Sequence, residues 1–479
     1  MLFILSCTGG KGGAASDRAL PEPGVIHAGM KCLEDPGTSY AIYIPTAGTF
    51  PDYSTETLPA PPETWRITRD VNGDRKYPVM IVFDPHADGM LPVKKYSTLA
   101  EKYGFILLGS CDSKNGMTGE ATGQIARALL NEALKYYPAD TARIYLLGFS
   151  GGARVASMAA MTDPLIKGVI CCGAGIGRSQ MNITHIPDYY GVAGTGDFNM
   201  SEMVQLDGPM AAAGFRFFIT TFPGIHAWPP EDVIEDGLVW HIGNSVRDGV
   251  LAKSPDYLSG LAAAFGARIE SLKTQGLLLP AAGEYRKVVS ILQGLAPVGS
   301  FIDSLSSLER DSAYLQRVHY QTLVLKREME EQEELVRALQ KENLSWWKTQ
   351  ILKCKENEEH QARGEKWKYT EDTLKNRRLL SFLGLICYMN ASALVAQHDE
   401  TGAEKAIGIY ALAEPGNPEP EYLKAILLAR RPDTAAAIGR LRVAVSKGFD
   451  DKMRMNAQPE FGNLKGSAGW QELMKSMDH

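Results

Sequence analysis

A serine lies between glycines where the chain changes from a strand pattern to a helix pattern. Residues 144–149 are largely apolar and predict a buried strand, and the small residues of 153–161 predict a helix. A serine at such a turn is held in a tight conformation that exposes its hydroxyl above the sheet, and flanking glycines leave room for it. Ser150 is therefore a candidate nucleophile. The backbone N–H of Gly151 is a candidate donor to the oxyanion that follows attack.

A serine hydroxyl needs a base to take its proton, and three histidines follow Ser150 in this part of the chain. His226 follows the last predicted strand, in the loop FPGIHAWPP, so it is expected at the carboxyl edge of the sheet, where Ser150 also emerges. His185 precedes a strand and is expected at the opposite edge, and His241 falls within a predicted helix. We predict that His226 is the general base; an ordinary loop histidine that caps a turn is the alternative.

The base must in turn be oriented by an acid, which is expected at the end of the preceding strand. Asp197 follows the apolar run 189–194 in a tight turn at the carboxyl edge. Asp188 lies at the wrong end of the same run, and Glu202 and Asp207, in the next predicted helix, are the reserve candidates. Asp197 is the predicted acid, with a helix N-cap as the alternative.

The loop after the third predicted strand, DPHADG at residues 84–89, is expected to supply a second oxyanion donor. The backbone N–H of His86 or of Ala87 would join that of Gly151. A lone GxSxG motif occurs by chance, but here it coincides with an acid, a base and a loop in a consistent order. Trp228, two residues beyond the predicted base, either lines the cleft as a substrate-binding residue or packs under its own loop.

These residues need a sheet to position them, and strand-like and helix-like segments alternate over residues 24–250. Continuous apolar runs predict strands that are buried on both faces, as in a parallel sheet. Helical patterns cover 121–137 and 202–213, for example. The eight predicted strands are 25–33, 39–45, 77–84, 104–111, 142–149, 167–174, 189–196 and 215–222. The fold class is thus α/β, with about eight mostly parallel strands.

Three segments, GFSGGARVA, GTGDFN and PGIHAWP, resemble the esterase branch of the α/β-hydrolase superfamily, which includes polyhydroxybutyrate depolymerase-like, feruloyl esterase-like and acetylxylan esterase-like proteins. The resemblance covers residues 24–250. It implies hydrolysis of carboxylic esters through an acyl-enzyme, with no metal or organic cofactor, and gives Ser150, Asp197 and His226 their roles as a triad. The loop DPHADG departs from the His-Gly pair that is commoner in these esterases.

The connection between the sixth and seventh predicted strands, residues 175–188, is too short for a lid domain. We therefore expect Ser150 to lie in an open cleft, which suits a bulky or polymer-borne ester. The appended helical domain could instead cover the site. Arg154 and Arg178 could meet an anionic substrate, although an arginine on a helix surface is the default interpretation for both.

The chain beyond residue 252 is predicted to be all helical. Residues 251–378 form a helical linker region with a long charged stretch at 309–363, read as a solvated helix face or a helical hairpin. The apolar run 379–396 is shorter than a membrane span requires and predicts a buried helix. Residues 379–479 are similar to a tetratricopeptide array, with helix pairs and a closing P-x-F-x-x-L unit, and could bind a protein partner.

The chain has 479 residues and a net charge of −6, and it lacks a basic patch with interleaved aromatics, which argues against a nucleic-acid partner. Its seven cysteines show no CxxC spacing, so neither a zinc site nor a disulfide framework is expected. Residues 1–23 resemble the remnant of a lipoprotein signal followed by a flexible linker, with Cys7 as the lipidated residue. A cell-envelope location, periplasmic or at the surface, with contact to a membrane only through this anchor, is therefore expected; a cytoplasmic protein is the alternative.

The sequence thus predicts a serine esterase with an appended helical domain. A serine peptidase of the prolyl-oligopeptidase type shares the order of the triad, but no propeller-length segment precedes the hydrolase-like part. A third hypothesis is an interaction protein whose helical repeats bind a partner while the hydrolase-like half is inactive. The intact set of Ser150, Asp197 and His226 argues against it.

Overall fold

The computed structural model describes residues 19–46, 58–177, 183–360, 366–431 and 434–477. The chain divides into two units, the first made of Met1–Gly194 and Glu202–Tyr314 and the second of Thr195–Ser201 and Leu315–His479. Cys7, the predicted lipidation site, lies outside the described residues.

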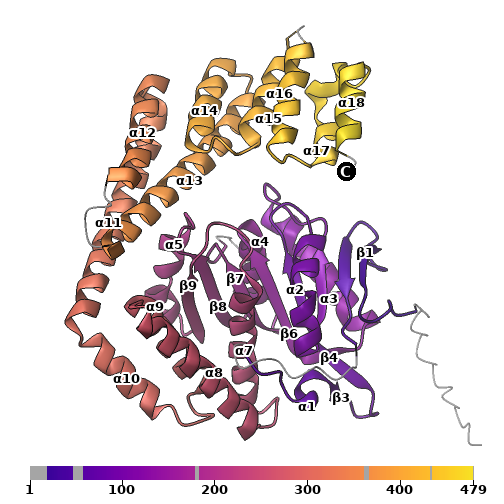
Figure 1. Ribbon diagram of the computed structural model, residues 1–479. Coiled ribbons are helices and arrows are strands. Elements are labelled where there is room, and N and C mark those ends of the chain that lie inside the picture. The colour runs from indigo at the N-terminus through magenta and orange to yellow at the C-terminus, as the bar shows by residue number, and fades with distance from the viewer. Residues whose placement is uncertain (1–18, 47–57, 178–182, 361–365, 432–433, 478–479) are drawn as a thin grey trace, which may run out of the picture. The chain divides into compact units, whose positions relative to one another are not determined.

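Nine strands form the sheet of the first unit (Figure 1), in the order β1-β2-β5-β4-β6-β7-β8-β9, with the short β3 paired to β4. The pairs from β4–β5 and β4–β6 through β8–β9 are parallel, and those of β1–β2, β2–β5 and β3–β4 are antiparallel. The strands are β1 (Ile26–Lys31), β2 (Ser39–Tyr43), β3 (Thr68–Arg69), β4 (Arg75–Phe83), β5 (Ile106–Ser110), β6 (Ala139–Phe149), β7 (Ile166–Cys172), β8 (Asp188–Gly194) and β9 (Phe217–Phe222).

Eight of the nine strands lie within or across the apolar runs that predict them, so the mostly parallel α/β class is confirmed. The ninth, β3, was not predicted. It has two residues, one half-buried and one exposed, and so has neither the length nor the apolar pattern that marks a strand in sequence.

Helices cover both faces of the sheet (Figure 1). One face packs against α2 (Met90–Tyr103), α7 (Glu231–Arg247), α8 (Pro255–Thr274) and α9 (Leu278–Leu292), and their apolar side chains share one core with the strands. The other face packs mainly against α3 (Gly119–Tyr136) and α4 (Gly151–Thr162). The short helices of the unit are α1 (Glu63–Arg66), α5 (Met200–Val204), α6 (Asp207–Ala212) and α10 (Gly299–Glu309).

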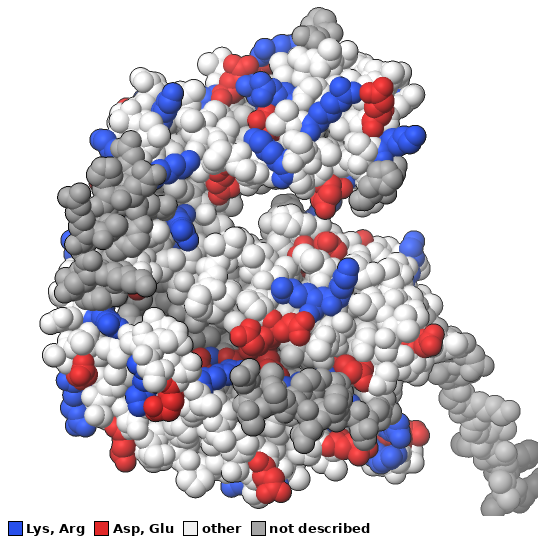
Figure 2. Space-filling model, in the orientation of Figure 1, with Lys and Arg blue, Asp and Glu red and all other residues white. Residues whose placement is uncertain are grey.

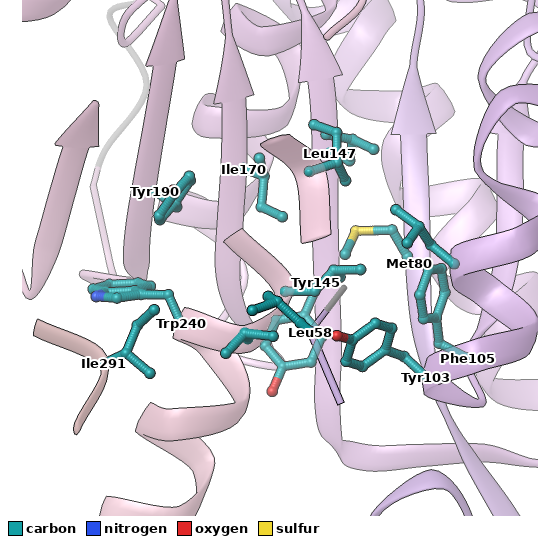
Figure 3. Packing of buried hydrophobic residues seen from close by; sticks show 14 of the residues in the cluster. Leu58, Met80, Tyr103, Phe105, Tyr145, Leu147, Ile170, Tyr190, Trp240 and Ile291 are labelled. Carbon is teal, nitrogen blue, oxygen red and sulfur yellow. The ribbon is translucent and has the colours of Figure 1, made fainter. Parts of the chain in front are cut away.

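Large aromatic side chains fill the first of these cores. Figure 3 shows Tyr145 and Tyr190 from the strands in the same layer as Trp240 from α7, and all three are buried. Burial of a side chain of this size contributes on the order of 2–3 kcal/mol. Such a core holds the strand ends rigid, and the loops that leave those ends inherit fixed positions.

The first unit extends beyond residue 250, the predicted end of the catalytic domain. Helices α8 and α9 bury Leu261, Phe265, Val288 and Ile291 in the core that covers the sheet, and the compact unit ends at Tyr314. The predicted linker region 251–378 is therefore divided between the two units. Helices that pack on a sheet and helices that pack on one another have the same amphipathic pattern, so sequence alone did not separate them.

The predicted helix over 202–213 is two short helices instead. Helix α5 ends at Val204, and α6 begins at Asp207. Pro209 explains the break, because proline has no N–H to donate inside a helix and is tolerated in the first turn. The restart at Asp207 places Pro209 in that first turn.

Among its described residues, the second unit consists of helices and the turns that connect them, with no strand. Its helices are α11 (Ser312–Lys341), α12 (Leu344–His360), α13 (Lys366–Ala396), α14 (Glu400–Ala413), α15 (Glu419–Ala429), α16 (Thr434–Ser446), α17 (Lys452–Ala457), the 3-10 turn η2 (Pro459–Asn463) and α18 (Ala468–Ser476). Successive helices from α13 to α16 contact one another, and α16 contacts α18. An all-helical second half is thus confirmed, and its likeness to tetratricopeptide repeats stays a prediction.

Two segments of this unit were singled out by their composition. Of the charged stretch 309–363, residues 312–341 form α11 and residues 344–360 form α12. Asn343 lies between the two helices, and its side chain accepts a hydrogen bond from Trp346 N. The apolar run lies within α13, where Thr370–Ala396 is long and apolar enough to cross a membrane by length and composition. Leu383, Cys387 and Ala391 are buried against neighbouring helices. Only 33% of the most apolar 18-residue window is buried, so the predicted buried helix is buried only in part.

Charged side chains of both signs lie close together on the surface of the second unit (Figure 2). Arg431, for example, pairs with Glu400 and Glu404, and Arg442 pairs with Glu472. Exposed pairs of this kind contribute little to stability. They do show that Arg431 and Arg442 have carboxylate partners within the same unit.

Candidate active site

Ser150 occupies a strained turn between β6 and α4. Its backbone has φ 52° and ψ −120°, a region that residues other than glycine rarely adopt. The neighbouring glycines make this turn possible by close backbone approach. A Cβ at Gly148 would overlap the carbonyl of Gly152, and a Cβ at Gly152 would overlap the carbonyl of Phe83 at the end of β4. The serine is therefore held at the carboxyl ends of the central strands, as its motif predicts.

His226 lies beside this serine. Its Nε2 is 2.9 Å from Ser150 Oγ, within hydrogen-bond distance, although 76 residues separate the two in the chain. The ring of His226 also packs against that of Phe149, with 4.7 Å between the ring centroids. Both Ser150 and His226 are half-buried, so the pair is fixed by packing yet still reaches solvent. A nucleophile and a base at this separation are arranged for proton transfer.

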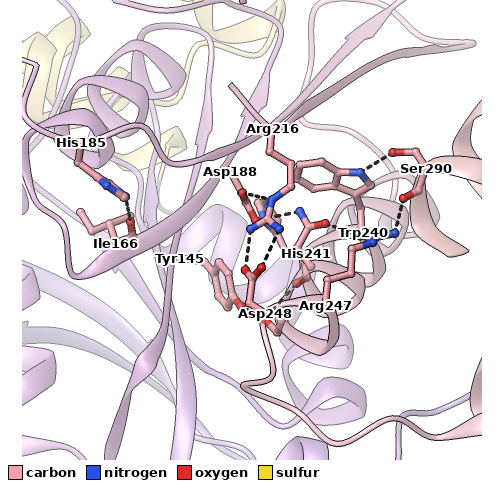
Figure 4. A network of polar contacts seen from close by, with 12 residues as sticks. Tyr145, Ile166, His185, Asp188, Arg216, Trp240, His241, Arg247, Asp248 and Ser290 are labelled. Carbon is pink, nitrogen blue, oxygen red and sulfur yellow. Dashed lines mark hydrogen bonds and ion pairs between the residues drawn. The ribbon is translucent and has the colours of Figure 1, made fainter. Parts of the chain in front are cut away.

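The other two histidines that follow Ser150 in the first unit lie elsewhere (Figure 4). His185 is placed at the amino end of β7, where its Nε2 is 3.1 Å from the carbonyl oxygen of Ile166. His241 is buried in α7 between Tyr145 and Trp240, and burial lowers its pKa to about 3. Both residues therefore lie away from the serine turn, which is at the carboxyl end of β6, as predicted.

Asp197, the predicted acid, is the third residue after the end of β8. It is 1% exposed, and its Oδ1 accepts a hydrogen bond of 2.8 Å from the backbone N of Asn199. Its carbonyl oxygen also accepts from Met200 N, at the start of α5. A buried carboxylate in a strand-end turn suits the role predicted for Asp197, which stays a prediction.

Of the two reserve acids, Asp207 is exposed at the start of α6, and Glu202 has other partners. Glu202 forms a two-point ion pair with Arg154 of α4, with N–O distances of 2.8 and 2.9 Å, and also accepts from the backbone N of Gly175. This pair occupies Arg154, which was considered as a contact for an anionic substrate. Asp188 lies at the amino end of β8 and pairs with Arg216, and burial raises the pKa of this carboxyl. Arg178 lies outside the described residues.

The predicted oxyanion donors differ in what surrounds them. Gly151 is the first residue of α4, where an N–H group has no acceptor within the helix. The backbone N of His86 donates to Asp84 Oδ1 at 2.7 Å, so it is already engaged. The backbone N of Ala87 is 3.4 Å from the carbonyl oxygen of Asp84, a long contact, and Ala87 has φ 65°. Of the two candidates in this loop, the geometry favours Ala87.

Trp228 packs under the loop that carries His226. Its Nε1 donates to Asp84 Oδ2 at 2.8 Å, and its ring lies against Phe149 and Tyr96 at centroid distances of 5.4 and 5.8 Å. These contacts favour the packing alternative over a role as a substrate-binding residue. Sequence reasoning placed Asp84 in the oxyanion loop but gave it no role. Its bond to an indole 144 residues away has no local signal.

Asn115 is a second residue that sequence reasoning missed. Its side-chain oxygen lies where a Cβ on Gly151 would have to be, so the amide rests on the first residue of α4. The backbone N of Asn115 donates to the carbonyl of Pro85 at 2.8 Å, which joins its loop to the oxyanion loop. The available signal was that loops after adjacent parallel strands converge at one edge of the sheet.

The arrangement of these groups suits acyl transfer. A serine with a histidine on its hydroxyl and helix N–H groups beside it can attack a carbonyl and stabilise the resulting oxyanion. No group of three or more metal-ligating side chains with suitable geometry occurs among the residues that the structure describes.

No family model and no curated protein matches this chain. The solved structures to which it is similar include an S-formylglutathione hydrolase (FrmB) from Staphylococcus aureus, at 10% identity, covering 47% of this chain and 100% of that one with a TM-score of 0.34. Another is FphF, a fluorophosphonate-binding serine hydrolase of Staphylococcus aureus, at 10% identity, 46% and 99% coverage and a TM-score of 0.32. An esterase of Pyrobaculum calidifontis matches at 11% identity, 48% and 88% coverage and a TM-score of 0.33.

Proposed function

We propose that this protein is a serine hydrolase that cleaves carboxylic esters through an acyl-enzyme. Ser150 is the nucleophile, His226 is the general base and Asp197 is the acid that orients the base. The oxyanion is stabilised by the backbone N–H groups of Gly151 and Ala87. No metal or organic cofactor takes part in the proposed reaction.

The observation that carries the proposal is the 2.9 Å contact between His226 Nε2 and Ser150 Oγ, at a serine with positive φ. Strain of this kind costs on the order of 1–3 kcal/mol and persists only where surrounding structure imposes it. A purely structural serine gains nothing from such a conformation. The same turn presents the hydroxyl to the base and to the N-terminus of α4, which is the arrangement that acyl transfer requires.

In the proposed reaction His226 takes the proton from Ser150 Oγ as the oxygen attacks the ester carbonyl. The proton then passes to the leaving alcohol as the C–O bond breaks and the acyl-enzyme forms. Water, deprotonated by His226, attacks the acyl carbon in the second half, and Ser150 recovers its proton. Asp197 keeps the imidazole in the tautomer that has Nε2 free to accept.

Partition of the acyl group between water and methanol tests this pathway. Acetates of p-nitrophenol, 4-methylumbelliferone and phenol should give the same ratio of methyl acetate to acetate, since all three pass through one acetyl-enzyme. A ratio that changes with the leaving group, or a folded protein with no turnover of any ester, contradicts the proposal.

A matched ester and amide separate the esterase from the peptidase alternative. We expect kcat/KM for p-nitrophenyl acetate to exceed that for p-nitroacetanilide by at least about 10³-fold, because the amide leaving group must be protonated before it departs. Comparable rates on the two, or rapid cleavage of prolyl anilides, would favour the peptidase.

The helical unit and the cellular location are separate proposals. We propose that the helices from α13 to α18 bind a protein partner, and that Cys7 carries a lipid that anchors the protein in the cell envelope. Mass spectrometry of protein purified from its own cells tests the anchor. The proposal requires a diacylglyceryl mass on Cys7, and an unmodified Cys7 preceded by an intact N-terminus rejects it.

A further inference from the structure

A buried carboxylate, Asp84, lies where three segments of the proposed site meet, and the proposed reaction does not use it. Asp84 directly follows β4 and is 2% exposed. A carboxylate taken out of water costs several kcal/mol unless hydrogen bonds compensate. The donors that satisfy Asp84 therefore indicate why a charged residue stands here.

One oxygen of Asp84 holds the oxyanion loop. Oδ1 accepts from the backbone N of His86 at 2.7 Å and is 3.4 Å from the backbone N of Asp88. These two amides flank Ala87, whose left-handed conformation costs an alanine about 1–2 kcal/mol. Bonds on both sides of the strained residue fix the direction of its N–H, the proposed oxyanion donor.

The other oxygen holds the loop of the base. Oδ2 accepts from Trp228 Nε1 at 2.8 Å, and Trp228 is two residues beyond His226. The indole packs on Phe149, which also packs on the ring of His226. The indole bond thus sets the depth at which the loop, and with it the imidazole, lies over the nucleophile.

The turn that carries Ser150 also packs against the backbone at Phe83 and Asp84. A Cβ on Gly152 would overlap the carbonyl oxygen of Phe83 and lie 3.2 Å from the backbone N of Asp84. The first turn of α4 is therefore in direct backbone contact with the segment that carries the carboxylate. Asp84 is joined to the nucleophile by its backbone, and to the oxyanion loop and the base loop by its two side-chain oxygens.

We propose that Asp84 is a positioning residue that fixes the oxyanion loop and the His226 loop relative to Ser150. The inference rests on the proposed function. Its consequence is specific: loss of the carboxylate should weaken stabilisation of the transition state while leaving binding of the substrate nearly unchanged. Small displacements of an oxyanion donor and a base act on the transition state far more than on the ground state.

Asp84→Asn and Trp228→Phe break the two halves of this link; the first is isosteric, and the second removes the indole N–H while keeping an aromatic ring. With p-nitrophenyl acetate we expect kcat to fall about 10- to 100-fold in Asp84→Asn, which is the range for one hydrogen bond to a charged group. We expect about a tenfold fall in Trp228→Phe, and KM within threefold of wild type in both. The double variant should match Asp84→Asn within about threefold, since both changes remove one shared bond.

Asp70→Asn is a matched control. Asp70 Oδ1 accepts from the backbone N of Asn72 at 2.9 Å and of Asp74 at 3.0 Å, the same two offsets along the chain as at Asp84. Its turn joins β3 to β4, at the amino end of β4. We expect the control to have kcat within twofold of wild type. That result would show that loosening an aspartate turn at the other end of β4 does not by itself lower kcat.

The outcomes decide the proposal. Asp84→Asn with wild-type kcat overturns it, as does a change confined to KM or a double variant in which the two losses multiply. If Asp84→Asn does not fold, Trp228→Phe decides alone: a tenfold loss of kcat at constant KM supports the role, and unchanged kcat rejects it. A folded wild type that hydrolyses no ester rejects the proposed function itself, and is distinct from an active wild type with an equally active Asp84→Asn.

Discussion

The two ends of the parallel strands in the first unit both carry histidine and carboxylate groups, with different consequences. At the carboxyl ends, Ser150 and His226 are half-buried and bonded to each other. At the amino ends, Asp188 and Asp248 both pair with Arg216, with N–O distances of 2.6 Å in each pair, and His241 is buried in the core (Figure 4).

The two edges carry similar residue types and differ in what surrounds them. Burial lowers the pKa of His241 to about 3, so this imidazole stays neutral at physiological pH and has no path to solvent. Arg216 likewise holds the pKa of Asp248 below its usual range. The charges at the amino edge join helix α7 to the sheet, whereas at the carboxyl edge Ser150 and His226 are half-buried and within reach of solvent.

The largest difference between the two edges should appear when His226 is removed. His226→Gln keeps a polar side chain of similar length but cannot take up the serine proton, and we expect kcat on esters to fall about 10⁴-fold. Stability should stay within about 1 kcal/mol of wild type, since the residue is half-buried. Steady-state kinetics with p-nitrophenyl acetate and urea denaturation measure the two quantities. A variant that retains a tenth of wild-type activity would remove His226 from the mechanism.

His241 should govern stability at low pH instead of activity. Its folded pKa of about 3 lies below the value of about 6.5 expected in the unfolded chain, so the unfolded state binds more protons between those values. Its contribution therefore lowers the free energy of unfolding as pH falls from 6.5 toward 3, by up to about 1.4 kcal/mol per pH unit.

The measurement is urea denaturation at pH 7.0, 5.5 and 4.5 for wild type and His241→Phe. The phenylalanine keeps an aromatic ring beside Tyr145 and Trp240 but cannot be protonated. Its stability should fall less steeply with pH, with kcat unchanged at pH 7. Equal slopes for the two proteins would show that His241 does not stay neutral in the fold.

A smaller loss of stability is expected when the amino-edge charge network is cut. Arg216→Ala removes the guanidinium from the largely buried Asp188 and leaves it the hydrogen bond from Asn244 Nδ2 of α7, at 2.8 Å. We expect a loss of about 1–3 kcal/mol in the free energy of unfolding and kcat within twofold of wild type. Arg216→Lys, which keeps the charge, should recover part of the loss. If kcat falls by more than the loss of folded protein accounts for, the amino edge also affects catalysis, which would contradict the proposed division of roles between the two edges.

The smallest effect should follow from His185→Gln. This change affects one hydrogen-bond contact, of 3.1 Å to the carbonyl of Ile166, at a half-buried position. We expect less than about 1 kcal/mol of destabilisation and no change in ester hydrolysis. Since the substitution is the same as at His226, the pair isolates position from residue type. A large loss of activity here would show that the amino edge also takes part in catalysis.

Much of the site follows from rules that act along the chain. Apolar runs place the strands, and loops that leave parallel strands at their carboxyl ends must share an edge. Ser150 and His226 could therefore be brought together from sequence, across 76 residues, because Ser150 directly follows β6 and His226 lies in the loop after β9. The break at Pro209 was also open to prediction, since proline limits where a helix can run.

What sequence could not supply depends on contacts between distant side chains. The bond from Trp228 to Asp84, the amide of Asn115 on Gly151 and the capture of the His86 N–H by Asp84 each require coordinates. The extension of the first unit to Tyr314 is another case, because the apolar stripes of α8 and α9 fit a sheet or another helix equally well. Local patterns identify the candidate groups, and tertiary contacts determine their partners.

The central claim is that Ser150 is an activated nucleophile, and a fluorophosphonate probe tests it most directly. Folded wild-type protein should gain one phosphonyl group, as measured by intact mass, and peptide mapping should place it on Ser150. Ser150→Ala, with an unchanged thermal unfolding midpoint, should gain none. A folded wild type that does not react, or an adduct that persists in Ser150→Ala, would contradict the account.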